Sequence, residues 1–111
     1  NVRVADKLGH TALHYAAMTV GPEREVVRIM NLLVARGADV NQRSDERYAR
    51  TPLEYAVGQS DVGRVEFLLG HGAIPNSSTA EGKSLQAVAE EHGHHAIAEA
   101  LRTAIAGRDD R

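Results

Sequence analysis

Apolar residues recur at helical spacing in one stretch of the chain that turn-forming residues enclose. Its apolar positions are separated by three or four residues, which is the period of one face of an α-helix. They are Val26, Ile29, Met30 and Leu33. Pro22 and Glu23 stand where helices favour proline and acidic residues, and Gly37 stands where a left-handed helix end favours glycine. The pattern predicts a helix between Pro22 and Gly37.

The same kind of stretch occurs more than once. Residues 9–17, 49–57 and 82–89 resemble one another, and each precedes one member of a second similar set, residues 26–38, 62–73 and 93–101. A repeat of this kind predicts that each unit folds as one pair of helices and that successive pairs stack. We call each helix pair, with the connecting arm before it, a unit.

The spacing between units is regular apart from two insertions. Thr51 and Ser84 are 33 residues apart, whereas Thr11 and Thr51 are 40 apart. Five of the seven extra residues fall between the two patterns of the first unit, around residues 20–24, and two fall in the following arm, residues 42–49. We therefore expect a longer second helix in the first unit and a longer arm before the second.

The ends of the predicted helices carry suitable residues. Thr11 and Thr51 stand at N-cap positions, and Pro52 suits the first helical turn. Gly37 and Gly72 end second helices, where a left-handed backbone penalises any Cβ. Paired small residues in the first helices allow neighbouring helices to approach closely: Ala16 and Ala17, then Ala56 and Val57.

A 33-residue unit with Thr-Pro-Leu at residues 51–53, paired small residues, Leu-Leu at 68–69 and Gly-Ala at 72–73 resembles the ankyrin repeat. The resemblance covers nearly the whole chain. It implies an all-α solenoid of stacked helix-turn-helix units with short β-hairpin or turn arms. The expected units are residues 6–41, 46–76 and 79–107, forming one domain over 1–107, and a charged tail over 108–111.

The third unit departs from the pattern. Leu85 stands at the family's Pro and Gln86 at its core Leu, so we expect Leu85 and Val88 to face inward. Arg102 replaces the apolar residues of earlier units, Val34 and Leu69, which is typical of a polar cap at a solenoid end. We expect no such polarity at the other end, lined by Leu8, Leu13, Ala16, Met30 and Leu33, and interpret the chain as the C-terminal part of a longer array.

Composition limits the class of protein. Apolar residues make up 42% and charged residues 25%, which is ordinary for a globular domain. The formal charge of −2 argues against a duplex-DNA binder, and no apolar run approaches the roughly 20 residues that span a bilayer. Cysteine is absent, which excludes disulfides and thiolate metal sites. We expect a cytoplasmic or nuclear monomer with no nucleic-acid or membrane partner.

Histidines and carboxylates do not form a recognisable reactive site. His92, His94 and His95 cluster, and His10 and His14 are four apart. Zinc needs three or four convergent ligands, and His10 precedes the helix cap, so it should not share a helical face with His14. The resemblance gives His14 a structural hydrogen-bonding role. No carboxylate stands in a motif that places a base beside a nucleophile. We expect no metal, no cofactor and no enzymatic activity.

Binding is the remaining function class. Tyr15 and Tyr55 occupy the same position in successive units, and tyrosine and arginine are enriched at binding hot spots. The alternative is that these tyrosines only fill the space between units. The candidate contacts lie on the concave face of first helices and arms: Tyr15, Met18, Asp45, Glu46, Arg47, Tyr48, Arg50, Tyr55 and Gln59.

We therefore expect a non-catalytic module that binds a protein or peptide. The alternatives are a structural cap of a longer array, with the main binding surface upstream, and an inhibitory domain that docks on an enzyme. The expected core lies between units and contains Leu13, Leu33, Leu53, Leu68, Leu69 and Ile97, with Phe67 beside Leu68.

Overall fold

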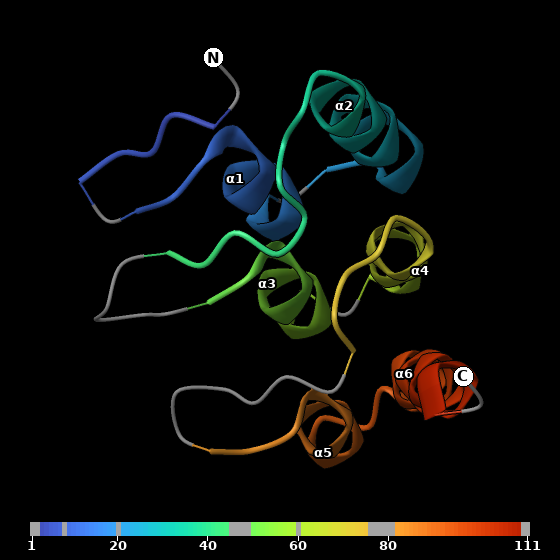
Figure 1. The fold of residues 1–111 in the computed structure, drawn as a ribbon. Helices are drawn as coiled ribbons and strands as arrows, with labels where there is room; N and C mark the ends of the chain where they lie inside the picture. Colours follow the sequence, from blue (N-terminus) through green and yellow to red (C-terminus); the bar gives the residue numbers. More distant parts are fainter. Residues whose placement is uncertain are drawn as a thin grey trace.

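Six helices pair into three units in chain order (Figure 1). The computed structural model describes residues 3–7, 9–19, 21–44, 50–59, 61–75 and 82–109. The first unit holds α1 (Ala12–Met18) and α2 (Glu23–Ala35), and the second holds α3 (Pro52–Gly58) and α4 (Val62–Gly70). The third holds α5 (Leu85–Glu91) and α6 (His95–Asp109), and no strand occurs among the described residues.

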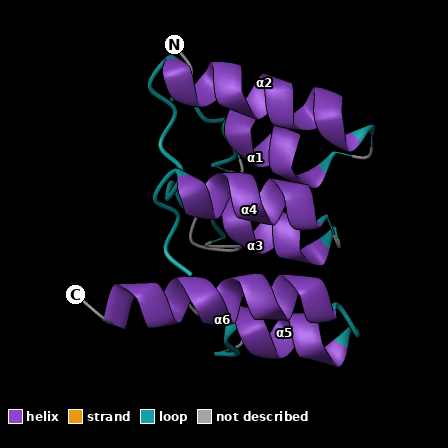
Figure 2. Ribbon diagram, turned by 90° about the vertical axis from the view of Figure 1, so that its right-hand side faces the viewer, coloured by secondary structure: helices purple, strands orange, loops and turns teal. Residues whose placement is uncertain are grey.

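The units stack side by side in two layers. The first helices α1, α3 and α5 form one layer, and the second helices α2, α4 and α6 form the other (Figure 1). Figure 2 shows that the link between the two helices of a unit lies at the same side of every unit, so the three second helices run parallel. The all-α solenoid expected from the repeat is confirmed.

The predicted helix ends are present. The Thr51 hydroxyl oxygen accepts a hydrogen bond from the backbone N–H of Glu54 at 3.4 Å, and Pro52 is the first residue of α3. Gly37 and Gly72 have φ of 100° and 95°, in the left-handed region that favours glycine. Local sequence therefore sets where these helices begin and end.

The insertion in the first unit lengthens its second helix, as predicted. α2 has 13 residues and α4 has 9, whereas α1 and α3 each have 7. The extra turn lies at the N-terminal end of α2 and carries Glu23 and Glu25. At the other end of the chain, α6 continues to Asp109, into the segment expected as a tail.

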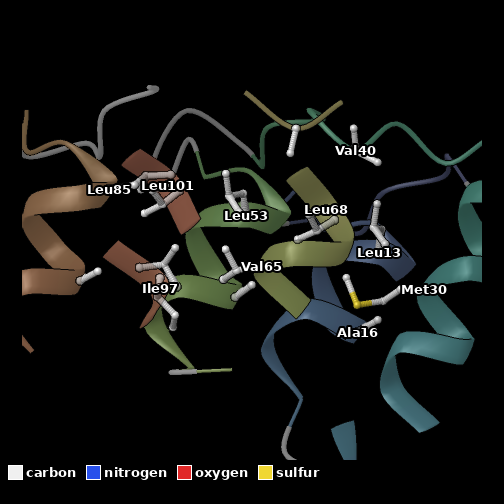
Figure 3. Close-up of a cluster of buried hydrophobic side chains, with 14 of the residues drawn as sticks. Leu13, Ala16, Met30, Val40, Leu53, Val65, Leu68, Leu85, Ile97 and Leu101 are labelled. Carbon is white, nitrogen blue, oxygen red and sulfur yellow. The ribbon is translucent and has the colours of Figure 1, made fainter. Parts of the chain in front are cut away.

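The core runs through all three units (Figure 3). Leu13, Leu53, Leu68 and Ile97 are buried as expected. The expectation was wrong for two leucines, which are only half-buried. Leu33 lies on the flank of the first unit against which no described residue stacks, and Leu69 borders an open groove between α4 and α6. Phe67 is also half-buried, and its ring stacks on His71 at 4.2 Å between centroids.

The end formed by α5 and α6 is polar, as predicted for a cap. Arg102 is exposed, with its guanidinium 3.6 Å from a carboxylate oxygen of Glu90, and Lys83 pairs with Glu91 at 2.9 Å. Leu85 is buried and Val88 packs half-buried against the core. The inward placement of these two residues is therefore confirmed.

The opposite end is apolar, and Leu33 lies there as expected, but the expectation was wrong for three other residues. Leu13, Ala16 and Met30 point into the core rather than outward (Figure 3). The rotation of α1 and α2 exposes the neighbouring positions instead, and these include Ile29 and Leu32, which are 51% and 52% exposed. Leu8 lies outside the described residues.

Candidate partner-binding surface

Two rows of side chains recur in register along the layer of first helices. The residue before each helix cap is basic, and it is His10, Arg50 and Lys83 in the three units. One turn into each helix stand Tyr15, Tyr55 and Val88. Because the units stack with constant geometry, equivalent positions form continuous rows across the surface. We call this surface the first-helix face.

The two tyrosines meet around one histidine. The ring centroid of His10 lies 5.5 Å from that of Tyr15 and 5.5 Å from that of Tyr55, and both contacts are edge-on. Edge-to-face aromatic contacts at this distance are favourable. Tyr15 is 47% exposed and Tyr55 is half-buried.

Both tyrosine hydroxyls are hydrogen-bonded within the protein. Tyr15 donates to a carboxylate oxygen of Asp6, and this hydrogen bond is the main cause that raises the pKa of Tyr15. The Tyr55 hydroxyl lies 2.6 Å from Nε2 of His10. The Tyr55 side chain thus joins two units, which agrees with the packing alternative for that residue. Tyr15 keeps a large exposed ring surface.

Beneath this cluster, His14 is fully buried and bonded at both ring nitrogens. Nδ1 accepts a hydrogen bond from the backbone N–H of Thr11 at 3.0 Å, and Nε2 lies 3.0 Å from the carbonyl oxygen of Arg50. Burial lowers the pKa of His14, opposed in part by its hydrogen bond to Arg50. The neutral ring with its proton on Nε2 satisfies both contacts. The structural role that the resemblance implies for His14 fits this geometry.

Arg50 lies between the arm and the helices. Its backbone N–H donates to Oγ of Ser44 at 3.0 Å, and its carbonyl oxygen accepts from the Ser44 backbone N–H at 2.9 Å. Its guanidinium carbon lies 5.9 Å from the centre of the Tyr55 ring, within cation–π range. The arm therefore holds a basic side chain beside the aromatic row.

A cleft of about 310 Å³ opens between α3 and α5, next to Arg50. Both apolar and charged residues line it, and among the charged ones Glu54 is buried. The lining residues are Arg50, Glu54, Gly58, Lys83, Leu85, Val88, Glu91 and His92. Apolar lining residues with a few convergent polar groups are the usual form of a binding cleft.

Sequence reasoning found only part of this surface. Met18 is half-buried at the end of α1, and Gln59 is exposed just after α3. Asp45, Glu46, Arg47 and Tyr48 lie outside the described residues. Of the candidate contacts, the structure brings Tyr15, Tyr55 and Arg50 together.

The candidate contacts from the sequence include no residue of the third unit, although the repeat spacing indicates which residues are equivalent there. Val88 takes the place of Tyr15 and Tyr55, and His92 takes the place of Gln59. These equivalent positions extend the candidate surface onto α5. No local pattern predicted that Glu54 would line the cleft, because that depends on how α5 packs against α3.

The described residues offer no place for a metal ion. Among them, no group of three histidine or acidic side chains is arranged to hold one. His10 and His14 were expected on different faces, but their rings lie 5.5 Å apart because the arm turns back over α1. In the described part of the chain, no helix is long and apolar enough to cross a membrane.

Comparisons with known proteins agree with the repeat. The family model described as Ankyrin repeat matches residues 8–45. Over 84 residues, the chain is 37% identical to a B-cell lymphoma 3 protein homolog of Mus musculus, covering 76% of this chain and 17% of that protein. It is also 35% identical over 89 residues to the potassium channel AKT1 of Oryza sativa subsp. indica, covering 80% of this chain and 9% of the channel.

The name of a third relative indicates another activity. The chain is 29% identical over 100 residues to a protein of Oryza sativa subsp. japonica named probable E3 ubiquitin-protein ligase XBOS34, covering 90% of this chain and 19% of that protein. The chain thus spans less than a fifth of each of these relatives. Their names describe unrelated activities, so the shared segment corresponds to a common module.

Proposed function

Because the chain belongs to the ankyrin-repeat family, whose repeats generally serve as protein–protein interaction modules, we propose that it binds a protein or peptide on its first-helix face. The partner lies across α1, α3 and α5 and contacts the arms. The function is recognition without chemistry.

One observation supports the proposal: the row of basic residues runs beside the row that contains the tyrosines, with an exposed ring in the first unit and a cleft next to Arg50. Tyr15 is 47% exposed, Arg50 stands over Tyr55, and the cleft between α3 and α5 begins at Arg50. Tyrosine and arginine combine a large contact area with polar groups, which is why they dominate binding hot spots.

The candidate contacts differ in how accessible their side chains are. Tyr15, Arg50 and Gln59 offer accessible side chains, and Met18 supports them at the end of α1. Tyr55 serves mainly to hold His10 and to position Arg50, because its hydroxyl bonds to His10. The arm residues Asp45, Glu46, Arg47 and Tyr48 remain candidate contacts from the sequence.

The test is affinity capture with the 111-residue chain from its native extract, in parallel with Tyr15→Ala/Arg50→Ala. A matched control is Glu66→Ala, an exposed residue of α4 on the other layer. A partner retained by the parent chain and the control should bind the double variant at least tenfold more weakly, about 1.4 kcal/mol. Isothermal titration calorimetry measures the dissociation constants.

Capture that survives Tyr15→Ala/Arg50→Ala but fails with Glu66→Ala would place the interface on the second helices and overturn the proposal. Tyr55→Phe adds a second control, because it removes only the hydroxyl that bonds to His10. We expect Tyr55→Phe to lower thermal stability slightly and to leave capture within about threefold, a change below 1 kcal/mol.

A second candidate function is that of a terminal cap, with further binding surface elsewhere in a longer protein. The polar end formed by α5 and α6 supports it, since Arg102 and Glu90 occupy a surface that an added unit would have to cover. Arg102→Leu should then increase self-association in light scattering. An unchanged monomer fraction would count against a capping role for this end.

A further inference from the structure

The cleft between α3 and α5 is built from the same repeat positions as the aromatic cluster between α1 and α3. In that cluster the Tyr55 ring lies between the first and second units, with its centroid 5.5 Å from that of His10 and 5.9 Å from that of His14. Arg50 stands beside the same ring. One unit later, the equivalents of these residues all line the cleft: Arg50 for His10, Glu54 for His14, Lys83 for Arg50 and Val88 for Tyr55.

Two smaller residues open the second of these gaps. Val88 stands where the second unit has Tyr55, and Gly58 stands where the first unit has Met18. A Cβ added at Gly58 would meet no atom within 4 Å. Space that a tyrosine ring takes up between the first and second units is therefore left as a cleft of about 310 Å³ between the second and third. This volume is near the lower limit for ligand pockets, roughly 300–1,000 Å³, and suits one inserted side chain.

The charges that line the cleft are balanced. Two cations, Arg50 and Lys83, stand with two carboxylates, Glu54 and Glu91. Lys83 pairs with Glu91 at 2.9 Å, and Nη1 of Arg43 lies 3.9 Å from a carboxylate oxygen of Glu54. A charged group that entered the cleft would lose its hydration and meet a like charge as well as an opposite one. A neutral side chain with an apolar body and one polar group avoids this cost, and tyrosine has that form.

We propose that the cleft receives a tyrosine side chain of the protein or peptide partner, at the position equivalent to that of Tyr55 between the first and second units. Val88 and Leu85 provide apolar contact for the ring. The guanidinium of Arg50 provides a cation for its face, which favours an aromatic over an aliphatic side chain. The hydroxyl can donate to a carboxylate or accept from a cation of the cleft. This proposal rests on the proposed function, because it names the chemistry of the partner at the same first-helix face.

Nuclear magnetic resonance of the isotope-labelled chain tests the cleft with N-acetyl-L-tyrosinamide as the probe. We expect a dissociation constant on the order of 1 mM, since the probe is small, and shifts concentrated on α3 and α5. N-acetyl-L-leucinamide should bind at least fivefold more weakly, because it has no ring to face Arg50. The O-phosphorylated tyrosine probe should also bind more weakly, because its phosphate would lie beside Glu54 and Glu91.

Val88→Tyr fills the cleft from within and restores the residue that the first two units have at this position. The variant should bind the tyrosine probe at least tenfold more weakly, while its melting temperature should be no lower than that of the parent chain. Glu66→Tyr is the matched control, because it places the same residue on the exposed surface of α4. It should bind the probe as the parent does.

Circular dichroism checks that Val88→Tyr is folded. If it is not, Gly58→Met narrows the same cleft from α3 and should weaken probe binding in the same direction. Gly58 is the last residue of α3 and has no positive φ, so a side chain fits its backbone.

Three results with the probes would overturn the proposal. They are a leucine or phosphotyrosine probe that binds as tightly as the tyrosine probe, shifts that lie outside α3 and α5, and undiminished probe binding by folded Val88→Tyr. Each of them leaves partner binding elsewhere on the first-helix face unaffected.

Affinity capture separates this proposal from the proposed function. A partner that Val88→Tyr loses and Glu66→Tyr retains supports the tyrosine site. A partner that Tyr15→Ala/Arg50→Ala loses but Val88→Tyr retains would overturn the tyrosine site and leave the proposed function standing. Capture that depends on Glu66 instead would overturn the proposed function and this inference with it.

Discussion

Nε2 of His14 lies 3.0 Å from the backbone carbonyl oxygen of Arg50, which stands 36 residues later in the chain. His14 belongs to α1 and Arg50 to the arm before α3, so one buried imidazole joins two units. The same ring accepts the backbone N–H of Thr11 at the start of its own helix. Helix capping and the stacking of the first two units thus depend on the neutral form of one side chain.

The first prediction concerns pH. Burial lowers the pKa of His14 below the unfolded value of 6.5, so the unfolded chain binds more protons in this range. The stability that neutral His14 provides is fully present above pH 6.5 and is lost as the pH falls from there towards the folded pKa. We expect the free energy of unfolding, measured in urea, to decrease over this range.

His14→Gln is the control for the pH prediction, because its amide N–H₂ can reach the Arg50 carbonyl but does not titrate. The variant should be less stable than the parent at neutral pH and should show a flatter dependence on pH below 6.5. His10 and Asp6 lie nearby, and both act electrostatically on His14. If His14→Gln keeps the full slope, His14 is not the group that causes the pH dependence and the prediction is wrong.

The second prediction concerns the core between units. Leu53 is 1% exposed and packs in the middle unit, where both neighbours contribute to its surroundings (Figure 3). Leu53→Ala should lower the free energy of unfolding by roughly 2–5 kcal/mol, because it removes buried methyl groups and leaves a cavity. Urea denaturation measures the loss. Ile74→Ala, at a side chain 41% exposed, should cost under about 1 kcal/mol.

The sequence predicted the repeat and its helix ends well, because both depend on local physics. Proline restricts the backbone and glycine permits the left-handed conformation, whatever the chain packs against. The spacing of Thr51 and Ser84 gives the size of a unit. The longer α2 followed from counting residues between Thr11 and Gly37. These features require no knowledge of what each helix packs against.

The sequence predicted less about which face each side chain occupies. Leu33 and Leu68 hold the same place in their units, yet Leu33 is half-buried and Leu68 is fully buried. The difference arises because the first unit covers Leu68, while no described residue covers that side of Leu33. Likewise, the contact of Tyr55 with His10 joins residues 45 apart, and only the stacking angle between units determines it.

The third prediction compares two glycines at the end of α4. Gly72 has a φ of 95°, whereas Gly70 is the last helical residue, and a Cβ at either position meets no atom within 4 Å. Gly72→Ala should cost about 1–2 kcal/mol, because an L-residue is strained in the left-handed region. Gly72→Val should cost more.

At the neighbouring position, Gly70→Ala should be neutral or should stabilise by about 0.4–1 kcal/mol, since it reduces the entropy of the unfolded chain without strain. Thermal unfolding measures both variants under the same conditions. Equal effects at Gly70 and Gly72 would show that backbone conformation is not what selects glycine at residue 72.

The fourth prediction concerns Arg64, a buried cation in the second layer. Arg64 is 2% exposed, its Nη1 donates to the carbonyl oxygen of Ala17 at 2.8 Å, and its Nε lies 2.9 Å from Oδ2 of Asp61. It therefore ties α4 to the end of α1. Its equivalents in the other units are Ile29 and Ile97, so an isoleucine fits this position in the fold.

Arg64→Ile should destabilise the chain by about 3–5 kcal/mol, because it leaves the largely buried carboxylate of Asp61 without its cation. Adding Asp61→Asn removes that charge, and its amide oxygen can still cap α4. The double variant Asp61→Asn/Arg64→Ile should therefore recover part of the loss, even though it carries one more substitution. Urea denaturation of parent, single and double variants gives the comparison. If the double variant is no more stable than Arg64→Ile alone, the cost comes from the lost bond to Ala17 rather than from the unpaired carboxylate.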